Sequence, residues 1–96
     1  MNVSEYILQP SFRQEITVIR GAQFLTLKAF PNQYGSVEVT MFMLEDPSNK
    51  EYETVVVHSY KSYMTFAVDN PLEYLGSIVV ARHENYGETV HFFKEV

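Results

Sequence analysis

The stretch QEITVIRGAQFLTLKAF, residues 14–30, decides the fold of this chain. In its first half Ile16 and Val18 alternate with other residues, which places them on one face of an extended strand. Gly21–Ala22 then interrupts the pattern, and an apolar alternation resumes over residues 24–30. Because glycine adopts backbone conformations that strands do not use, this order predicts a strand, a turn and a second strand.

The same two-residue period continues along the chain. Residues 36–44 are apolar on both faces in their second half, which is typical of a strand in the middle of a sheet. Further strands are predicted over residues 51–60, 72–82 and 89–94, and Gly76 predicts a bulge or bend in the second of these. The residues expected to share a face are Leu25, Leu27 and Ala29 in one strand, and Val37, Val39, Met41 and Met43 in the next.

Turn-forming residues separate these segments. Asp46–Pro47 predicts a tight turn, because the aspartate bonds the backbone ahead of it and proline suits the second turn position. Asn70–Pro71 marks a boundary, since a residue before proline is driven towards extended geometry. Asn85 and Gly87 suit a hairpin loop that returns the last strand antiparallel to Ile78–Arg82.

These signals predict an all-β fold: one compact domain spanning residues 1–96, an antiparallel sandwich or small barrel of six to seven strands. Only residues 58–71, HSYKSYMTFAVDNP, fit two patterns. They alternate as a strand would, but they also carry the spacing of one short helix near residues 60–69. The residues at helical spacing are Tyr60, Tyr63, Met64 and Ala67.

Composition excludes several classes of protein. The chain has no cysteine, which rules out disulfides and thiolate sites, and its formal charge of −5 argues against nucleic-acid binding. No apolar run approaches the ~20 residues that span a bilayer, and the first residues lack the basic patch of a signal peptide. We therefore expect a cytoplasmic domain without a nucleic-acid or membrane partner.

Catalytic and metal-binding motifs are sparse. The 4 glycines are scattered singly, so no phosphate-binding loop is present. His83 and His91 flank the predicted hairpin and could lie opposite or diagonal to each other, with Glu84 or Glu88 as a further ligand. A metal-dependent enzyme built on these histidines is one alternative, but we expect no enzyme, no metal and no cofactor.

Two groups of residues are candidates for binding a partner. Tyrosines in predicted loops offer large contact surfaces with polar tips, which suits protein interfaces. Around residues 60–66 a lysine adds a cation to the aromatic rings, and a cluster of acidic residues surrounds the turn at residues 46–50 as a second contact or a solvated turn. The predicted contact residues are Tyr60, Lys61, Tyr63 and Phe66, with Glu45, Asp46, Glu51 and Glu53 as an acidic rim.

Four short segments share a layout with a known group of proteins. They are RGAQFLTL (Arg20–Leu27), LEDPSNKEYETVVV (Leu44–Val57), LEYLGS (Leu72–Ser77) and VHFFKE (Val90–Glu95). This order resembles small uncharacterised proteins of tailed bacteriophages, which have a Gly-Ala turn, an acidic-Pro turn, a Leu-x-Tyr-Ile-Gly-Thr segment and a closing histidine–aromatic strand. The resemblance implies a viral origin and supplies no mechanism.

The chain departs from that layout in the segment HSYKSYMTFAVD, residues 58–69, which stands where the phage proteins carry Gly-Thr-Gly-His. An aromatic loop on a rigid β-scaffold is suited to docking. The resulting hypothesis is a non-enzymatic phage protein that binds a host protein in the infected cell, as an inhibitor of a defence or gene-expression system. A structural protein that forms a homo-oligomer through exposed strand edges is the alternative.

Overall fold

The computed structural model describes residues 1–9, 12–34, 37–83 and 86–96, without the side chains of residues 80–87. The described residues contain no helix. The strands are β1 (Asn2–Leu8), β2 (Arg13–Ile19), β3 (Gln23–Pro31), β4 (Val37–Glu45), β5 (Tyr52–Lys61), β6 (Leu72–His83) and β7 (Tyr86–Glu95). The prediction of an all-β domain with six to seven antiparallel strands is confirmed.

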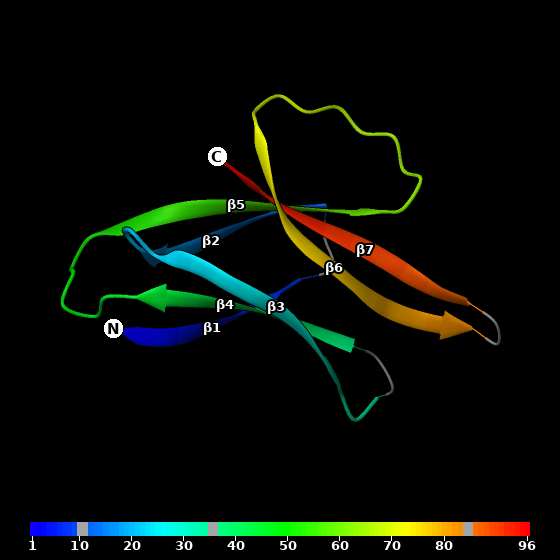
Figure 1. The fold of residues 1–96 in the computed structure, drawn as a ribbon, viewed down its shortest axis with the longest axis horizontal. Helices are drawn as coiled ribbons and strands as arrows, with labels where there is room; N and C mark the ends of the chain where they lie inside the picture. The colour runs from blue at the N-terminus through cyan, green and yellow to red at the C-terminus, as the bar shows by residue number, and fades with distance from the viewer. Residues whose placement is uncertain (10–11, 35–36, 84–85) are drawn as a thin grey trace.

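The strands form two antiparallel sheets, in the orders β1-β4-β3 and β2-β5-β7-β6 (Figure 1). The predicted turn between β2 and β3 is present: Gly21 has φ +85°, and Ala22 N donates to Ile19 O at 3.1 Å. Yet β2 pairs with β5 and β3 pairs with β4, so this turn carries the chain from one sheet to the other. The sheets face each other as a sandwich.

The core lies between the sheets and follows the predicted alternation. Met41 and Met43 of β4 are 0% and 1% exposed to solvent. Val18 and Val57 of the opposite sheet are 1% and 0% exposed. The complete set of buried apolar side chains is Leu8, Val18, Val39, Met41, Met43, Val55, Val57, Leu75 and Phe92. A small domain has one such core, so each of these side chains carries a large share of the stability.

The predicted alternation of β3 is wrong at Leu25. A bulge between Phe24 and Thr26 inserts one residue, so Phe24 and Leu27 both pack against the core while Leu25 is 45% exposed. The bulge lets the larger aromatic ring enter the core. Sequence alternation alone does not reveal an inserted residue, since the bulge shifts the phase of the strand by one.

The bulge predicted at Gly76 is confirmed. The register of β6 shifts between Tyr74 and Gly76, and Gly76 has φ +144°, a conformation essentially restricted to glycine. A Cβ atom at this position would lie 3.7 Å from Leu27 Cδ1 in β3. That distance is an ordinary van der Waals contact, so glycine is required here by the backbone conformation of the bulge and not by lack of space.

The segment at residues 58–71 is neither wholly strand nor helix. Its first four residues complete β5, and residues 62–71 form an exposed loop, which we call the aromatic loop. A turn starts it, in which Met64 N donates to Lys61 O at 3.2 Å. The short helix considered near residues 60–69 is not formed.

A buried carboxylate links the two sheets. Glu45, at the end of β4, is 2% exposed. Its Oε2 accepts hydrogen bonds from Tyr6 Oη at 2.7 Å in its own sheet and from Ile19 N at 2.9 Å in the other. Burial raises the pKa of Glu45, but hydrogen bonds from Ser4, Tyr6 and Ile19 together lower it by a larger amount. The pKa therefore lies below its ordinary value. The carboxylate is therefore ionised and fully engaged at neutral pH.

Candidate functional site

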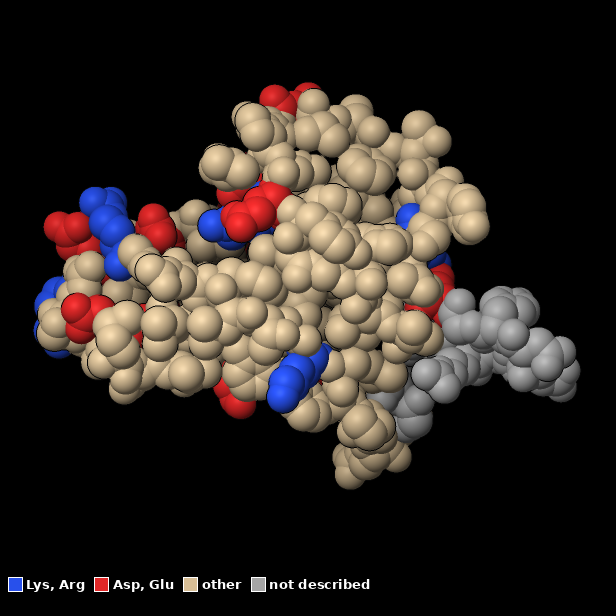
Figure 2. Space-filling model, in the orientation of Figure 1, with Lys and Arg blue, Asp and Glu red and all other residues tan. Residues whose placement is uncertain are grey.

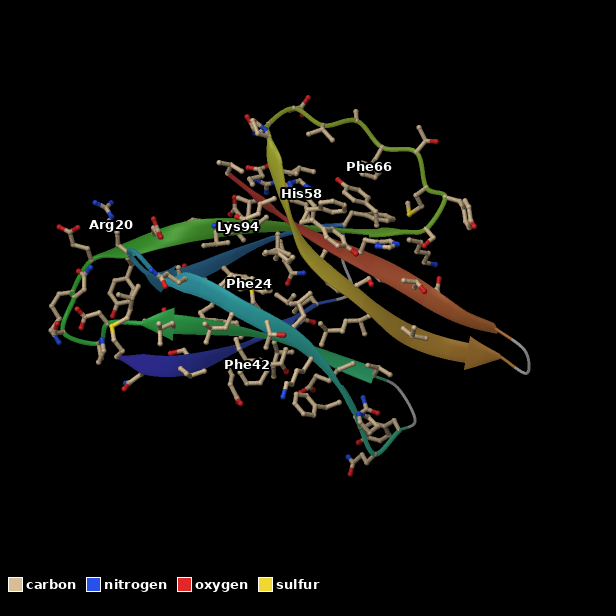
Figure 3. All side chains as sticks on the ribbon, viewed as in Figure 1. Arg20, Phe24, Phe42, His58, Phe66 and Lys94 are labelled. Carbon is tan, nitrogen blue, oxygen red and sulfur yellow. The ribbon has the colours of Figure 1, made fainter. Side chains whose placement is uncertain are left out.

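The aromatic loop is held on the outer face of the four-stranded sheet by ring stacking. Phe66 lies flat on Tyr60 of β5, with ring centroids 3.7 Å apart and an interplanar angle of 1°. Phe93 of β7 packs beside both rings at 6.1–6.2 Å. Figure 3 shows Phe66 turned from the loop towards the sheet. The middle of the loop is thus fixed to two strands that are themselves hydrogen-bonded to each other.

Two further contacts fix the start of the loop. The ring of His91 in β7 is bonded at both nitrogens, with Ser62 Oγ 2.8 Å from Nε2 and Tyr74 Oη 2.9 Å from Nδ1. Lys61 forms an ion pair with Glu88 of β7. These contacts tie the start of the loop to the sheet below it.

The end of the loop rests near a second histidine. His58 Nε2 lies 2.8 Å from Glu95 Oε1, and Tyr60 Oη lies 3.1 Å from His58 Nδ1. Since an ionised carboxylate only accepts, Nε2 is the donor in the hydrogen bond to Glu95. The hydrogen bond from His58 is the main reason that the pKa of Glu95 lies below its usual range, with Asn70 of the loop as a further donor. A pocket of about 100 Å³ lies beside this group.

The turn at the start of the loop holds a tyrosine in an unusual conformation. Tyr63 has φ +68°, and no other non-glycine residue in the described chain has a positive φ. It occupies the third position of the turn from Lys61 to Met64, where type II turns normally carry glycine or asparagine. Its side chain is fully exposed, at 104%. A large ring therefore stands in solvent on a backbone position that disfavours it.

The exposed side of the loop is apolar and almost uncharged. All residues from 61 to 71 are exposed, including Met64 at 36%, Phe66 at 38% and Val68 at 51%. Within residues 62–70 only Asp69 is charged, and the loop forms a largely uncharged ridge in Figure 2. Between the ridge and β7 lies an open hollow of about 380 Å³, with His91 and the Tyr60, Phe66 and Phe93 rings along it.

The structure brings together the four predicted loop contacts Tyr60, Lys61, Tyr63 and Phe66, which all border this hollow. It adds residues that were not predicted as partner contacts, notably Met64, His91 and Phe93. The last two alternate on one face of β7, and their two-residue spacing is visible in the sequence. Their position under the loop depends on the pairing of β7 with β5, which no local pattern indicates.

The predicted acidic rim lies elsewhere. Glu45 is buried between the sheets, and the other three residues surround the turn at the start of β5. Each has local contacts: Asp46 accepts from Ser48, Glu51 pairs with Arg20, and Glu53 accepts from Gly21 N. The aromatic loop follows the far end of the same strand, about 30 Å away. The two predicted contact groups therefore do not form one continuous surface.

The predicted metal site falls partly outside the described residues, because the side chain of His83 and all of Glu84 are among those not described. The backbone register pairs His83 with Tyr86, and Ser77 with His91. The two histidines are therefore neither opposite nor diagonal to each other, as the hypothesis required. Among the described side chains, no three histidine, aspartate or glutamate residues converge on one point.

Comparisons with known proteins identify no relative. No family model, no curated protein and no solved structure matches the chain. In the described part of the chain, no helix has the length and hydropathy needed to cross a bilayer.

Proposed function

We propose that this chain is a non-enzymatic binding protein that docks onto another protein through the aromatic loop. The observation that carries the proposal is Tyr63, an exposed ring held at φ +68° in the turn that starts a loop fixed to the sheet by stacking and hydrogen bonds. Backbone strain at an exposed residue lowers stability without a structural return. A binding contact made by the tyrosine ring would account for this residue at a strained position.

The form of the surface supports a protein partner. A ridge of aromatic and aliphatic side chains beside an open hollow resembles the centre of a protein interface, where tyrosine and methionine are enriched and charge is depleted. The hollow has room for one apolar side chain of the partner, which would pack against Phe66 and Phe93. The Lys61–Glu88 ion pair lies at its border, as polar groups do at an interface rim.

Two histidines help to hold the loop in its form. His58 and His91 each have both ring nitrogens within hydrogen-bond distance of protein side chains. Through Ser62, His91 ties the start of the loop to β7.

The class of partner is proposed from the resemblance to small phage proteins. On that basis we propose a host protein in the cytoplasm of the infected cell, with inhibition of a defence or gene-expression system as the outcome.

Affinity capture with matched tyrosine variants tests the proposal. The tagged chain, Tyr63→Ala and Tyr34→Ala are used to retain proteins from a lysate of the bacterial host. Tyr34 is 81% exposed on the β3–β4 connection and serves as the control. We expect a protein that is retained by the original chain and by Tyr34→Ala, and whose affinity for Tyr63→Ala, measured with purified components, is at least about tenfold weaker. Equal binding by both variants, or no specific protein retained, contradicts the proposal.

Replacement of Tyr63 by asparagine gives a second test that needs no partner. Asparagine tolerates positive φ, and the exposed tyrosine ring loses no buried contact. We expect Tyr63→Asn to raise the free energy of unfolding by about 0.5–1 kcal/mol in urea denaturation. If the variant is instead destabilised, the tyrosine ring contributes to folding and the argument from strain fails.

A further inference from the structure

The outer face of the three-stranded sheet combines apolar and charged side chains, and no other segment of the described residues packs over it. In the register of this sheet, the outward residues form rows across β1, β4 and β3. The edge side chains Val3, Ile7 and Phe30 are 58%, 55% and 45% exposed. The rows are Val3–Leu44–Gln23, Glu5–Phe42–Thr26, Ile7–Thr40–Lys28 and Glu38–Phe30.

This face differs from an ordinary solvent-facing sheet. Antiparallel strands with one wet face alternate apolar and polar residues. Strand β4 instead has Phe42 and Leu44 outward while Met41 and Met43 enter the core. Figure 3 shows Phe42 on the opposite side of β4 from Phe24, which packs between the sheets. The second half of β4 is therefore apolar on both faces, as in a strand with a layer on each side, and the domain supplies one layer.

The charges on this face are complementary to the same face of a second copy. Glu5 lies on β1 and Lys28 on β3, on opposite sides of β4 and in adjacent rows. Neither has an ion-pair partner among the described residues. A two-fold axis along β4, within the interface, places β1 of one copy over β3 of the other. Lys28 of one copy then lies between Glu5 and Glu38 of the other, within about 7 Å along the strands, and symmetry repeats the contact.

We propose that a second copy of this chain covers this face, with β1 over β3 in a symmetric dimer. The face measures roughly 30 Å by 15 Å, or about 900 Å² for both copies together. That area falls in the class of weak, reversible interfaces, so the dissociation constant is expected at about 10–100 μM. The contact is face to face and differs from pairing through strand edges.

A charge swap tests this arrangement by sedimentation equilibrium from about 5 to about 500 μM protein, which brackets the expected dissociation constant. Glu5→Lys and Lys28→Glu each bring like charges together across the interface and are expected to weaken the dimer at least about tenfold. The double variant restores opposite charges between positions 5 and 28 but brings the new carboxylate at position 28 towards Glu38 of the other copy, so it is expected to dimerise more tightly than either single variant and less tightly than the original chain. Lys50→Glu, exposed on the β4–β5 turn, makes the same change in net charge as Lys28→Glu and is the control.

Each result decides the question. Weakening by both single variants, recovery in the double variant and no effect of Lys50→Glu support the dimer. A monomer at every concentration overturns it. This interface is overturned by a dimer whose affinity is unchanged in the single variants, is lowered equally by Lys50→Glu, or is no higher in the double variant than in the single variants.

Discussion

Glu45→Ala is expected to lower the free energy of unfolding by about 3 kcal/mol, a large part of the stability of a domain of this size. The alanine removes the acceptor of the Tyr6 hydroxyl and of Ile19 N, which belong to different sheets. Both donors would then remain without this acceptor in a site that is closed to solvent, since Glu45 is only 2% exposed. A buried donor without a partner costs about 1–3 kcal/mol.

Urea denaturation of three variants measures this effect. Glu45→Gln keeps the shape and one acceptor oxygen, so we expect it to lose about half as much as Glu45→Ala. Glu51→Ala removes an exposed glutamate with an ion pair to Arg20 and should change stability by less than about 0.5 kcal/mol. A loss in Glu45→Ala no larger than in Glu51→Ala would show that the link between the sheets is energetically unimportant.

The same residues predict the pH dependence of stability. The pKa of Glu45 is lowered in the folded state, so the unfolded chain binds the proton more tightly and stability is lost as the pH falls below about 4.5. The pKa of Tyr6 is raised to about 12, first by burial and then by the hydrogen bond to Glu45, so its contribution is lost as the pH rises from 10 towards 12. Glu45→Gln should reduce the acid loss, and Tyr6→Phe the alkaline loss.

Met41→Ala is expected to cost about 3 kcal/mol, because Met41 is 0% exposed and its removal leaves a cavity between the sheets. Met64→Ala is the matched control, since Met64 is 36% exposed in the aromatic loop. We expect this variant to change stability by less than about 0.5 kcal/mol. Thermal and urea unfolding of both variants measure the difference, and equal losses would contradict the assigned core.

The two methionines also separate folding from binding. If the aromatic loop is the docking surface, Met64→Ala weakens binding to the captured partner while its unfolding curve stays unchanged. In a core variant such as Met41→Ala, the apparent affinity falls only because part of the protein is unfolded. It is therefore expected to recover at a lower temperature, where the folded fraction is larger.

Sequence alternation predicted the strands well because, in a strand with one buried face, every second residue is apolar. The faces of β2 and β4 follow directly from Ile16, Val18, Met41 and Met43. Strand β1 was not assigned, because Val3 and Ile7 on its outer face and Tyr6 and Leu8 on its inner face make both faces apolar and obscure the alternation. Pairing was not predictable for a related reason: alternation states which side of a strand is buried and is silent on which strand lies beside it.

The candidate site was predicted in part for the same reason. Tyr60, Lys61, Tyr63 and Phe66 are close in sequence, so their grouping on one surface needed no knowledge of topology. Glu45 looked like a surface residue because it precedes the turn signal at Asp46–Pro47. Its burial depends on contacts with Tyr6 and Ile19, which lie 39 and 26 residues away.

The order of strands in the four-stranded sheet has a consequence for how the chain reaches its native state. Strand β7 lies between β5 and β6, although it is the last of the seven to be synthesised. Until it emerges from the ribosome, β5 has only β2 beside it and β6 has no hydrogen-bonded neighbour. Such long-range pairing slows folding. The nascent chain therefore passes through a period with open strand edges, in which assistance from chaperones would have its greatest effect.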